Sequence, residues 1–380
     1  MPSSPIRALV DQLADLGTDG APCPQQVLAA LGSVPDPRHR RGVRHPITGI
    51  LVIAICAVAS GARSFAAMAE WASDTAAVLL AQIGIGAPDP STIRRALSRM
   101  DAEAFDAVLS KWAQTRTDPA VVAVDGKEVR GAKNGGGTTV RLLSALEHES
   151  SVVLAQVEVG AKSNEIPMFS VLLDQIQDVD GMVVTADALH AQRAHATYLH
   201  ERGADYVVTV KGNQPSLHHQ LQCLPWAQVP VGHRQRERAR GKITIRTTKA
   251  VAIEAGIDFP HAAQAVQIVR RSRPATGGPW RTEVAYAVTS VPAYQAGPEL
   301  LGRWVRGHWG TENGLHHVRD TTFAEDHSQI RTGSGPRVMA SLRNLALNLH
   351  RLAGVTNIAQ ATRRTARDPR RALELIGISP

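Results

Sequence analysis

The sequence is poor in cysteine and has no apolar run long enough to cross a membrane. Its three cysteines, Cys23, Cys56 and Cys223, are odd in number and far apart, which indicates neither a disulfide framework nor a zinc ribbon and favours a reducing, intracellular compartment. The most apolar stretch, residues 47–62, is shorter than the ~20 residues that a bilayer requires. The start, MPSSPIRALVDQL, lacks the apolar core of a secretory signal. We therefore expect a cytoplasmic protein with no membrane span.

The sequence also lacks internal repeats and low-complexity segments. Its 380 residues, 43% of them hydrophobic, suffice to bury the cores of two or three domains. The 42 Lys and Arg residues exceed the 34 Asp and Glu residues, which leaves a net charge of +8. This excess favours a polyanionic partner, most commonly nucleic acid, although many basic proteins bind none.

Residues 1–116 are predicted to form a helical N-terminal domain that contacts DNA or a partner protein. The segment PDPRHRRGVRH interrupts the helices with two prolines. Its basic residues, which include Arg38, Arg40 and Arg41, form either a phosphate-contacting arm or a solvated linker. Two later helices, within residues 90–113, are either a helix-turn-helix reader or a structural hairpin.

The hydrophobic pattern changes from helical to extended at Val121. The run VVAVDGK is rich in β-branched residues and has a glycine directly after its acid, which predicts a buried strand that ends by delivering Asp125 to a sheet edge. Alternating residues then predict two more strands, separated by turns, at 138–146 and 151–160. The three strands are expected to form an antiparallel meander.

Helices and strands alternate after this meander. A buried strand, MVVTADA, ends at Asp187. The other expected elements are a helix at 165–177, a helix at 191–202, a strand at 205–212 and a helix from residue 215. This order is the layout of a ribonuclease-H-like α/β fold, a mixed sheet with helices on both faces whose first and fourth strands are neighbours. Asp125 and Asp187 are therefore expected to converge.

These elements make residues 117–224 the first part of the core, and the pattern departs from it afterwards. Residues 225–292 alternate like strands between Gly and Pro turns, which predicts a β-rich insertion. Its Arg238 and Arg240 belong to a basic stripe that either tracks a DNA backbone or is only solvated. The remaining segments are 293–355, a helical second part of the core, and 356–380, a basic C-terminal tail.

Two carboxylates at neighbouring strand ends suit a divalent cation. Mg²⁺ prefers carboxylate and water oxygens, and it binds through few protein carboxylates together with substrate phosphates. Two such ions about 4 Å apart can activate an attacking oxygen and stabilise a leaving oxygen in phosphoryl transfer. Asp125 and Asp187 would need an acid partner from later in the chain.

Two sets of sequence blocks carry a family resemblance. The first set is VPDPRHRRGVRHP and GARSFAAMAEWA. The second set is AVDGKEVRGA, KSNEIPMF, VTADALHAQ, DYVVTVKGNQP and RGHWGTENGLHHVRDTTFAEDHSQIRTG. In this order they resemble the N-terminal associated domain and the catalytic blocks of the DDE insertion-sequence transposases, in the branch that includes the H-repeat-associated proteins. The resemblance extends from about Leu28 to Leu352.

The resemblance implies a three-carboxylate catalytic site that binds metal. Its members would be Asp125, Asp187 and Glu312, with Mg²⁺ as the cofactor and Mn²⁺ as a substitute. Three other acids in the same late stretch compete for the third place: Asp320, Glu325 and Asp326.

The resemblance also makes Lys127, Arg306 and Arg319 candidates for contacting DNA phosphates near the scissile bond. Arg319 stands where relatives usually have Leu. The expected partners are double-stranded DNA, as element ends and as target, and a second copy of the chain when ends are paired.

We therefore predict a DNA transposase that cuts at insertion-sequence ends and joins them to target DNA by metal-dependent phosphoryl transfer. One alternative is a ribonuclease-H-like nuclease without strand transfer. Another is a non-catalytic, transposase-derived DNA-binding protein. A hydrolase of small phosphate esters is disfavoured by the basic excess.

Overall fold

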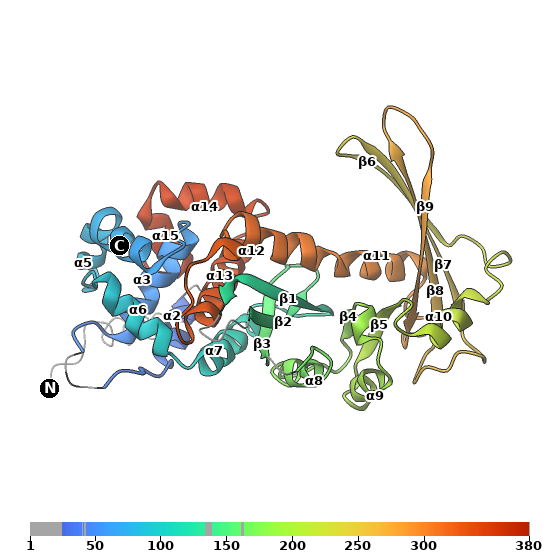
Figure 1. Cartoon of the computed structure of the whole chain (residues 1–380), viewed down its shortest axis with the longest axis horizontal. Coiled ribbons are helices and arrows are strands. Elements are labelled where there is room, and N and C mark those ends of the chain that lie inside the picture. The colour runs from blue at the N-terminus through green and yellow to red at the C-terminus, as the bar shows by residue number, and fades with distance from the viewer. Residues whose placement is uncertain (1–24, 40, 42, 134–138, 161–162, 380) are drawn as a thin grey trace.

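The computed structural model describes residues 25–39, 41, 43–133, 139–160 and 163–379. The molecule is elongated, with helices at one end, a sheet in the middle and tall strands that project at the other end (Figure 1). The first and last described helices of the chain lie together at the helical end (Figure 1).

The described part of the N-terminal region is helical, as expected. Its central helix, α3 (Ile47–Ala59), has every residue except Thr48 buried, so it lacks the polar face of a surface helix. At 13 residues it is a core helix, and among the described residues no helix has the length and apolar character needed to cross a membrane. The neighbouring elements are α2 (Gln25–Gly32), α4 (Phe65–Glu70), the π-helical turn η1 (Trp71–Thr75), α5 (Ala77–Gln82), α6 (Pro90–Arg99) and α7 (Ala102–Gln114).

The nine strands of the described chain form one mixed sheet. They are β1 (Val121–Lys133), β2 (Thr139–Glu147), β3 (Val153–Val159), β4 (Val183–Ala186), β5 (Asp205–Val210), β6 (His233–Ala239), β7 (Lys242–Ala252), β8 (Gln264–Pro274) and β9 (Arg281–Thr289). Their order is β3-β2-β1-β4-β5-β9-β8-β7-β6. The first three pair antiparallel, whereas β1, β4 and β5 run parallel. This topology confirms the ribonuclease-H-like core.

One detail of the prediction is wrong, because β1 does not end at Asp125. Gly126 continues the strand and pairs with Leu143 of β2, and it is not among the glycines with positive φ. The pairing with β4, however, runs only to Val124 opposite Ala186. Asp125 therefore lies inside β1, at the point where its parallel neighbour stops.

The predicted β-rich insertion extends the core sheet, since β9 pairs antiparallel with β5. β6 and β7 form its outer hairpin. Arg240 and Gly241, with φ of 49° and 70°, make the two-residue turn, as a hairpin with positive φ at both central residues requires. These strands are the tall feature on the right of Figure 1.

Helices cover both faces of the sheet core. Val184 and Val208 face one apolar cluster, which includes Phe169 and Leu199. Val183 and Val207 face a second cluster, because successive residues of a strand point to opposite faces. The flanking elements are α8 (Met168–Leu173), the 3-10 turn η2 (Ala188–His190), α9 (Arg193–Glu201), α10 (Pro215–Gln222) and α11 (Pro298–His308).

The rest of the chain returns to the helical end. Its long helix packs against α3, α7 and β3, and Val338, Leu342 and Leu345 on it are buried as their spacing predicted. The basic tail is docked, since Ala372, Leu373 and Ile376 are fully buried. These elements are the π-helical turn η3 (Thr311–His316), α12 (His317–Thr321), the 3-10 turn η4 (Glu325–His327), α13 (Gly335–Leu352), α14 (Ile358–Ala366) and α15 (Pro369–Leu375).

Candidate active site

Asp125 and Asp187 lie on neighbouring strands at the same edge. Each directly follows a residue of the last parallel pair, Val124 opposite Ala186, and neighbouring strands are only about 4.8 Å apart. The backbone N–H of Leu189 donates to Asp187 Oδ1 at 2.9 Å, and that of Gly126 donates to Asp125 Oδ1 at 2.9 Å. Both carboxylates are thus oriented by main-chain donors.

Glu312 reaches the same edge from the far end of α11. This helix approaches closely because Gly307 leaves room for His148, whose Nδ1 would lie 2.4 Å from a Cβ at that position. The helix then widens into η3, which carries Glu312 and, four residues later, His316. His316 Nδ1 lies 3.7 Å from Asp125 Oδ2, so this face of η3 meets β1 at the acid.

The electrostatics of Asp125 support convergence of the acids. Its pKa is raised to about 7, chiefly by burial, and the hydrogen bond from Gly126 opposes the rise. The negative charges of Asp187, Glu312 and Glu165 raise this pKa further, and like charges act strongly on a carboxyl only when they share its surroundings. The structure therefore brings the three predicted acids together and adds a fourth.

His316 supplies no countercharge at neutral pH. Its pKa is lowered to about 3, first by burial and then by the positive charges of Arg319 and Lys127, so the imidazole beside Asp125 is neutral. Within the described chain, none of the carboxylates of Asp125, Asp187 and Glu312 forms an ion pair with Lys or Arg.

The three competing acids already have cationic partners. Lys127 Nζ lies 2.7 Å from Asp320 Oδ1 and 3.9 Å from Asp326 Oδ1. Glu325 is fully buried between Arg319, at 2.8 Å, and Arg343, at 2.9 Å. Of the four late acids, Glu312 is thus the one left for the site.

The donor set fits a hard divalent cation. Asp125, Asp187 and Glu312 would hold it, because their oxygens are the ligands that Mg²⁺ and Mn²⁺ prefer and their negative charge lacks a basic partner in the described chain. No group of three His, Cys, Asp or Glu side chains in the described segments stands close enough to hold an ion without adjustment. Binding would therefore require these side chains to move toward one another.

Two of the predicted phosphate contacts are corrected by burial. Arg319 has no exposed side-chain surface, and both Nε and Nη2 donate to Glu325 at 2.8 Å, so it is a core residue. The Lys127 side chain is 7% exposed and its ammonium is held by Asp320. Both residues stabilise the structure behind the acids instead of presenting free charge to DNA.

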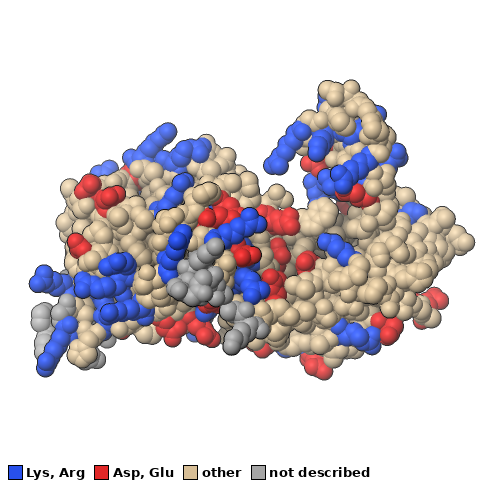
Figure 2. Space-filling model, viewed as in Figure 1, with Lys and Arg blue, Asp and Glu red and all other residues tan. Residues whose placement is uncertain are grey.

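The other predicted DNA contacts lie nearer the surface. Arg306 donates to Gln235 and Glu237 at 2.7 and 2.9 Å, which ties α11 to β6. Arg238 and Arg240 are exposed at the outer hairpin. Basic side chains gather on this projecting hairpin and on the helical end, while acidic ones gather between them (Figure 2).

The predicted basic arm is partly committed to its own loop. Arg38 Nη2 donates to Asp36 Oδ2 and to the His45 carbonyl, each at 2.7 Å, and its side chain is only 13% exposed. Arg41 is exposed, and Arg40 lies outside the described residues.

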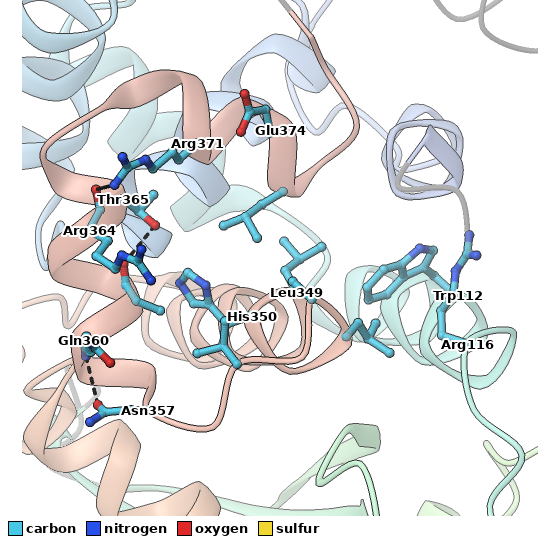
Figure 3. A pocket seen from close by; sticks show the side chains of 15 residues that line it. Trp112, Arg116, Leu349, His350, Asn357, Gln360, Arg364, Thr365, Arg371 and Glu374 are labelled. Carbon is cyan, nitrogen blue, oxygen red and sulfur yellow. Dashed lines mark hydrogen bonds between the residues drawn. The ribbon is translucent and has the colours of Figure 1, made fainter. Parts of the chain in front are cut away.

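A cavity of about 820 Å³ lies at the helical end, away from the acids (Figure 3). Trp112 of α7, Leu349 and His350 of α13, and Arg364 of α14 line it. None of the three acids is part of its wall. The candidate site is therefore an open sheet edge and not an enclosed pocket, which suits a large substrate.

Sequence reasoning missed two residues at the acid site. Glu165 lies in the block KSNEIPMF, and His190 in VTADALHAQ, but neither was assigned a role. A signal was available in Gly126, a glycine within a predicted buried strand, which often marks a close approach by another group.

Comparisons with known proteins agree with this geometry. The family described as "Transposase DDE domain" matches residues 116–349, and the one described as "DDE_Tnp_1-associated" matches residues 28–113. "Putative transposase YncI" of Escherichia coli O157:H7 is 28% identical over 349 residues, or 86% of this chain and 87% of that protein. "H repeat-associated putative transposase YhhI" of Escherichia coli (strain K12) is 26% identical over 355 residues, or 86% and 90%.

Among solved structures, a piggyBac transposase synaptic complex with hairpin DNA aligns with a TM-score of 0.44 at 9% identity, covering 97% of this chain and 80% of that chain. The family match alone spans more than half of the sequence. The chain therefore belongs to the transposase DDE domain family.

Proposed function

We propose that this chain cuts DNA at the ends of a mobile element and joins those ends to target DNA by metal-dependent phosphoryl transfer. The observation that carries the proposal is the meeting of Asp125, Asp187 and Glu312 at one sheet edge without a Lys or Arg partner in the described chain. Such a cluster of negative charge is costly unless cations compensate it.

The three side chains have separate tasks in this reaction. Asp187 is fixed by the Leu189 N–H and Asp125 by the Gly126 N–H, so both present oxygens at known places on rigid strands. Glu312, which is exposed on η3, closes the site from the opposite side. A bound Mg²⁺ or Mn²⁺ would lower the pKa of the attacking oxygen and neutralise charge on the reacting phosphate.

The reaction consists of two transesterification-type steps at phosphorus. In the first, water oxygen bonds to the phosphorus at the element end while the bond to the 3′ oxygen breaks, and that oxygen takes a proton to become a 3′ hydroxyl. In the second, this hydroxyl loses its proton and bonds to a target phosphorus while the target's own 3′ oxygen leaves. No oxidant or high-energy cofactor is required.

The charge distribution supports a DNA substrate held across the acids. Basic side chains lie on both sides of the acidic centre in Figure 2, among them Arg238 and Arg240 of the hairpin and Arg41 of the N-terminal loop. DNA phosphates bind such side chains by releasing counterions. We further propose that two copies of the chain pair the two element ends, and that they act on cytoplasmic DNA.

Cutting of labelled DNA that carries the element ends tests this function. Asp125→Asn, Asp187→Asn and Glu312→Gln each preserve side-chain size while removing a charge, so they are expected to abolish Mg²⁺-dependent cutting and to retain DNA binding in a mobility-shift assay. Asp258→Asn is the matched control, because the ion pair of Asp258 is with the exposed Arg193. Wild-type cutting by both the Asp125 and Asp187 variants would contradict the proposal.

A further inference from the structure

The carboxylate of Glu165 lies directly over β1 beside Asp125. A Cβ built on Gly126 would lie 2.3 Å from both oxygens and from the carboxyl carbon of Glu165. Since Gly126 has no positive φ and sits in a paired strand, its backbone conformation does not demand glycine. The space that Glu165 occupies is the reason that a side chain is excluded here.

A buried histidine faces the same carboxylate from η2. His190 Nε2 lies 3.7 Å from Glu165 Oε2, and the His190 side chain is only 1% exposed. Its ring is held against Phe169 and His195, with centroids 5.2 and 5.4 Å away. Among the described residues neither nitrogen of His190 has a hydrogen-bond partner.

An unpartnered buried polar group costs about 1–3 kcal/mol, so His190 favours a nearby acceptor. Glu165 is 25% exposed on a flexible side chain, and a movement of about 0.8 Å would bring it to ordinary hydrogen-bond distance of ~2.9 Å. His190 therefore holds Glu165 toward Asp125, where the negative charge of Glu165 acts on the pKa of Asp125.

We propose that Glu165 is a fourth carboxylate of the metal site, oriented by His190 and required for binding a second divalent cation. This inference rests on the proposed function. Four carboxylates carry a charge of about −4, which two divalent cations balance and one does not, and phosphoryl-transfer sites commonly hold two such ions about 3.5–4 Å apart.

Metal binding by the full chain tests the role of Glu165 independently of catalysis. Free Mn²⁺ is measured by electron paramagnetic resonance during a titration, and two bound ions per chain are expected for the wild type. Glu165→Gln should bind one ion, or require at least tenfold more Mn²⁺ to bind the second. Glu201→Gln, at the exposed end of α9, is the control and should match the wild type.

Gly126→Ala provides a second variant that leaves every charge in place. Its new methyl group would displace the Glu165 carboxylate, so it should reproduce the loss of the second ion. His190→Gln should weaken that ion less than Glu165→Gln, because the carboxylate remains but is less well held. Thermal unfolding midpoints close to that of the wild type would confirm that the Glu165→Gln and Gly126→Ala chains are folded.

The outcomes separate this inference from the proposed function. If the wild type binds Mn²⁺ and cuts end DNA, Asp125→Asn does neither, and Glu165→Gln matches the wild type in both, the role of Glu165 is overturned and the function stands. If the wild type neither binds Mn²⁺ nor cuts DNA, the function and the inference fail together.

Discussion

Replacing Glu325 by Gln should destabilise the protein strongly, because Glu325 is the only anion bonded to two buried guanidinium groups in the described part of this site. Arg319 donates to its two oxygens at 2.8 Å each, and Arg343 donates to Oε1 at 2.9 Å. All three side chains are at most 2% exposed. Either orientation of a Gln amide would turn an NH₂ group toward a guanidinium N–H, so the variant loses a charge and an acceptor together.

The expected cost is about 3–5 kcal/mol, the range for removing one partner of a buried ion pair. Equilibrium urea unfolding measures it, as a lower midpoint at an unchanged slope. Asp258→Asn removes an ion pair whose side chains are 60% and 78% exposed, and exposed pairs contribute only about 0–1 kcal/mol. A Glu325→Gln cost as small as that of Asp258→Asn would refute the assignment of Arg319 to the core.

Two further predictions concern pH and salt. Burial alone would raise the pKa of Glu325, but Arg319 and Arg343 outweigh it and lower the pKa to about 2; the stability difference between wild type and Glu325→Gln should therefore be constant above about pH 5 and shrink as the pH falls toward 2, where wild type loses the charge. Replacing Arg238 and Arg240 together by Ala should weaken DNA binding and reduce the slope of log K against log salt by about 0.9 for each DNA phosphate that these side chains neutralise, whereas Arg193→Ala, away from this hairpin, should leave that slope unchanged.

The ribonuclease-H-like core could be predicted because its strands are marked by local sequence patterns. β-branched runs and alternation located β1, β3, β4 and β5, and the right-handed crossover rule placed β1 beside β4. The meeting of Asp125 and Asp187 followed from that topology alone. α13 was equally accessible, since its apolar residues recur at helical spacing over 18 residues.

What the sequence could not supply was the difference between a surface charge and a buried one. Arg319 looked like a phosphate contact because it is basic and near Glu312, but its partner Glu325 is brought beside it only when η4 folds back. Gly126 likewise looked like the end of a strand, since a glycine that ends a strand and one that admits a neighbouring side chain are written identically. Glu165 becomes visible only when its loop is placed over β1.

The most direct test of the central claim is strand transfer by the purified chain. A DNA end that already carries its free 3′ hydroxyl is incubated with target plasmid and Mg²⁺, and joined products are counted for the wild type, for Asp125→Asn, Asp187→Asn and Glu312→Gln, and for Asp258→Asn. We predict joining by the wild type and by Asp258→Asn, and none by the other three. Cutting of end DNA without any joining would identify a nuclease instead, and joining that survives the loss of all three carboxylates would contradict the account of this site.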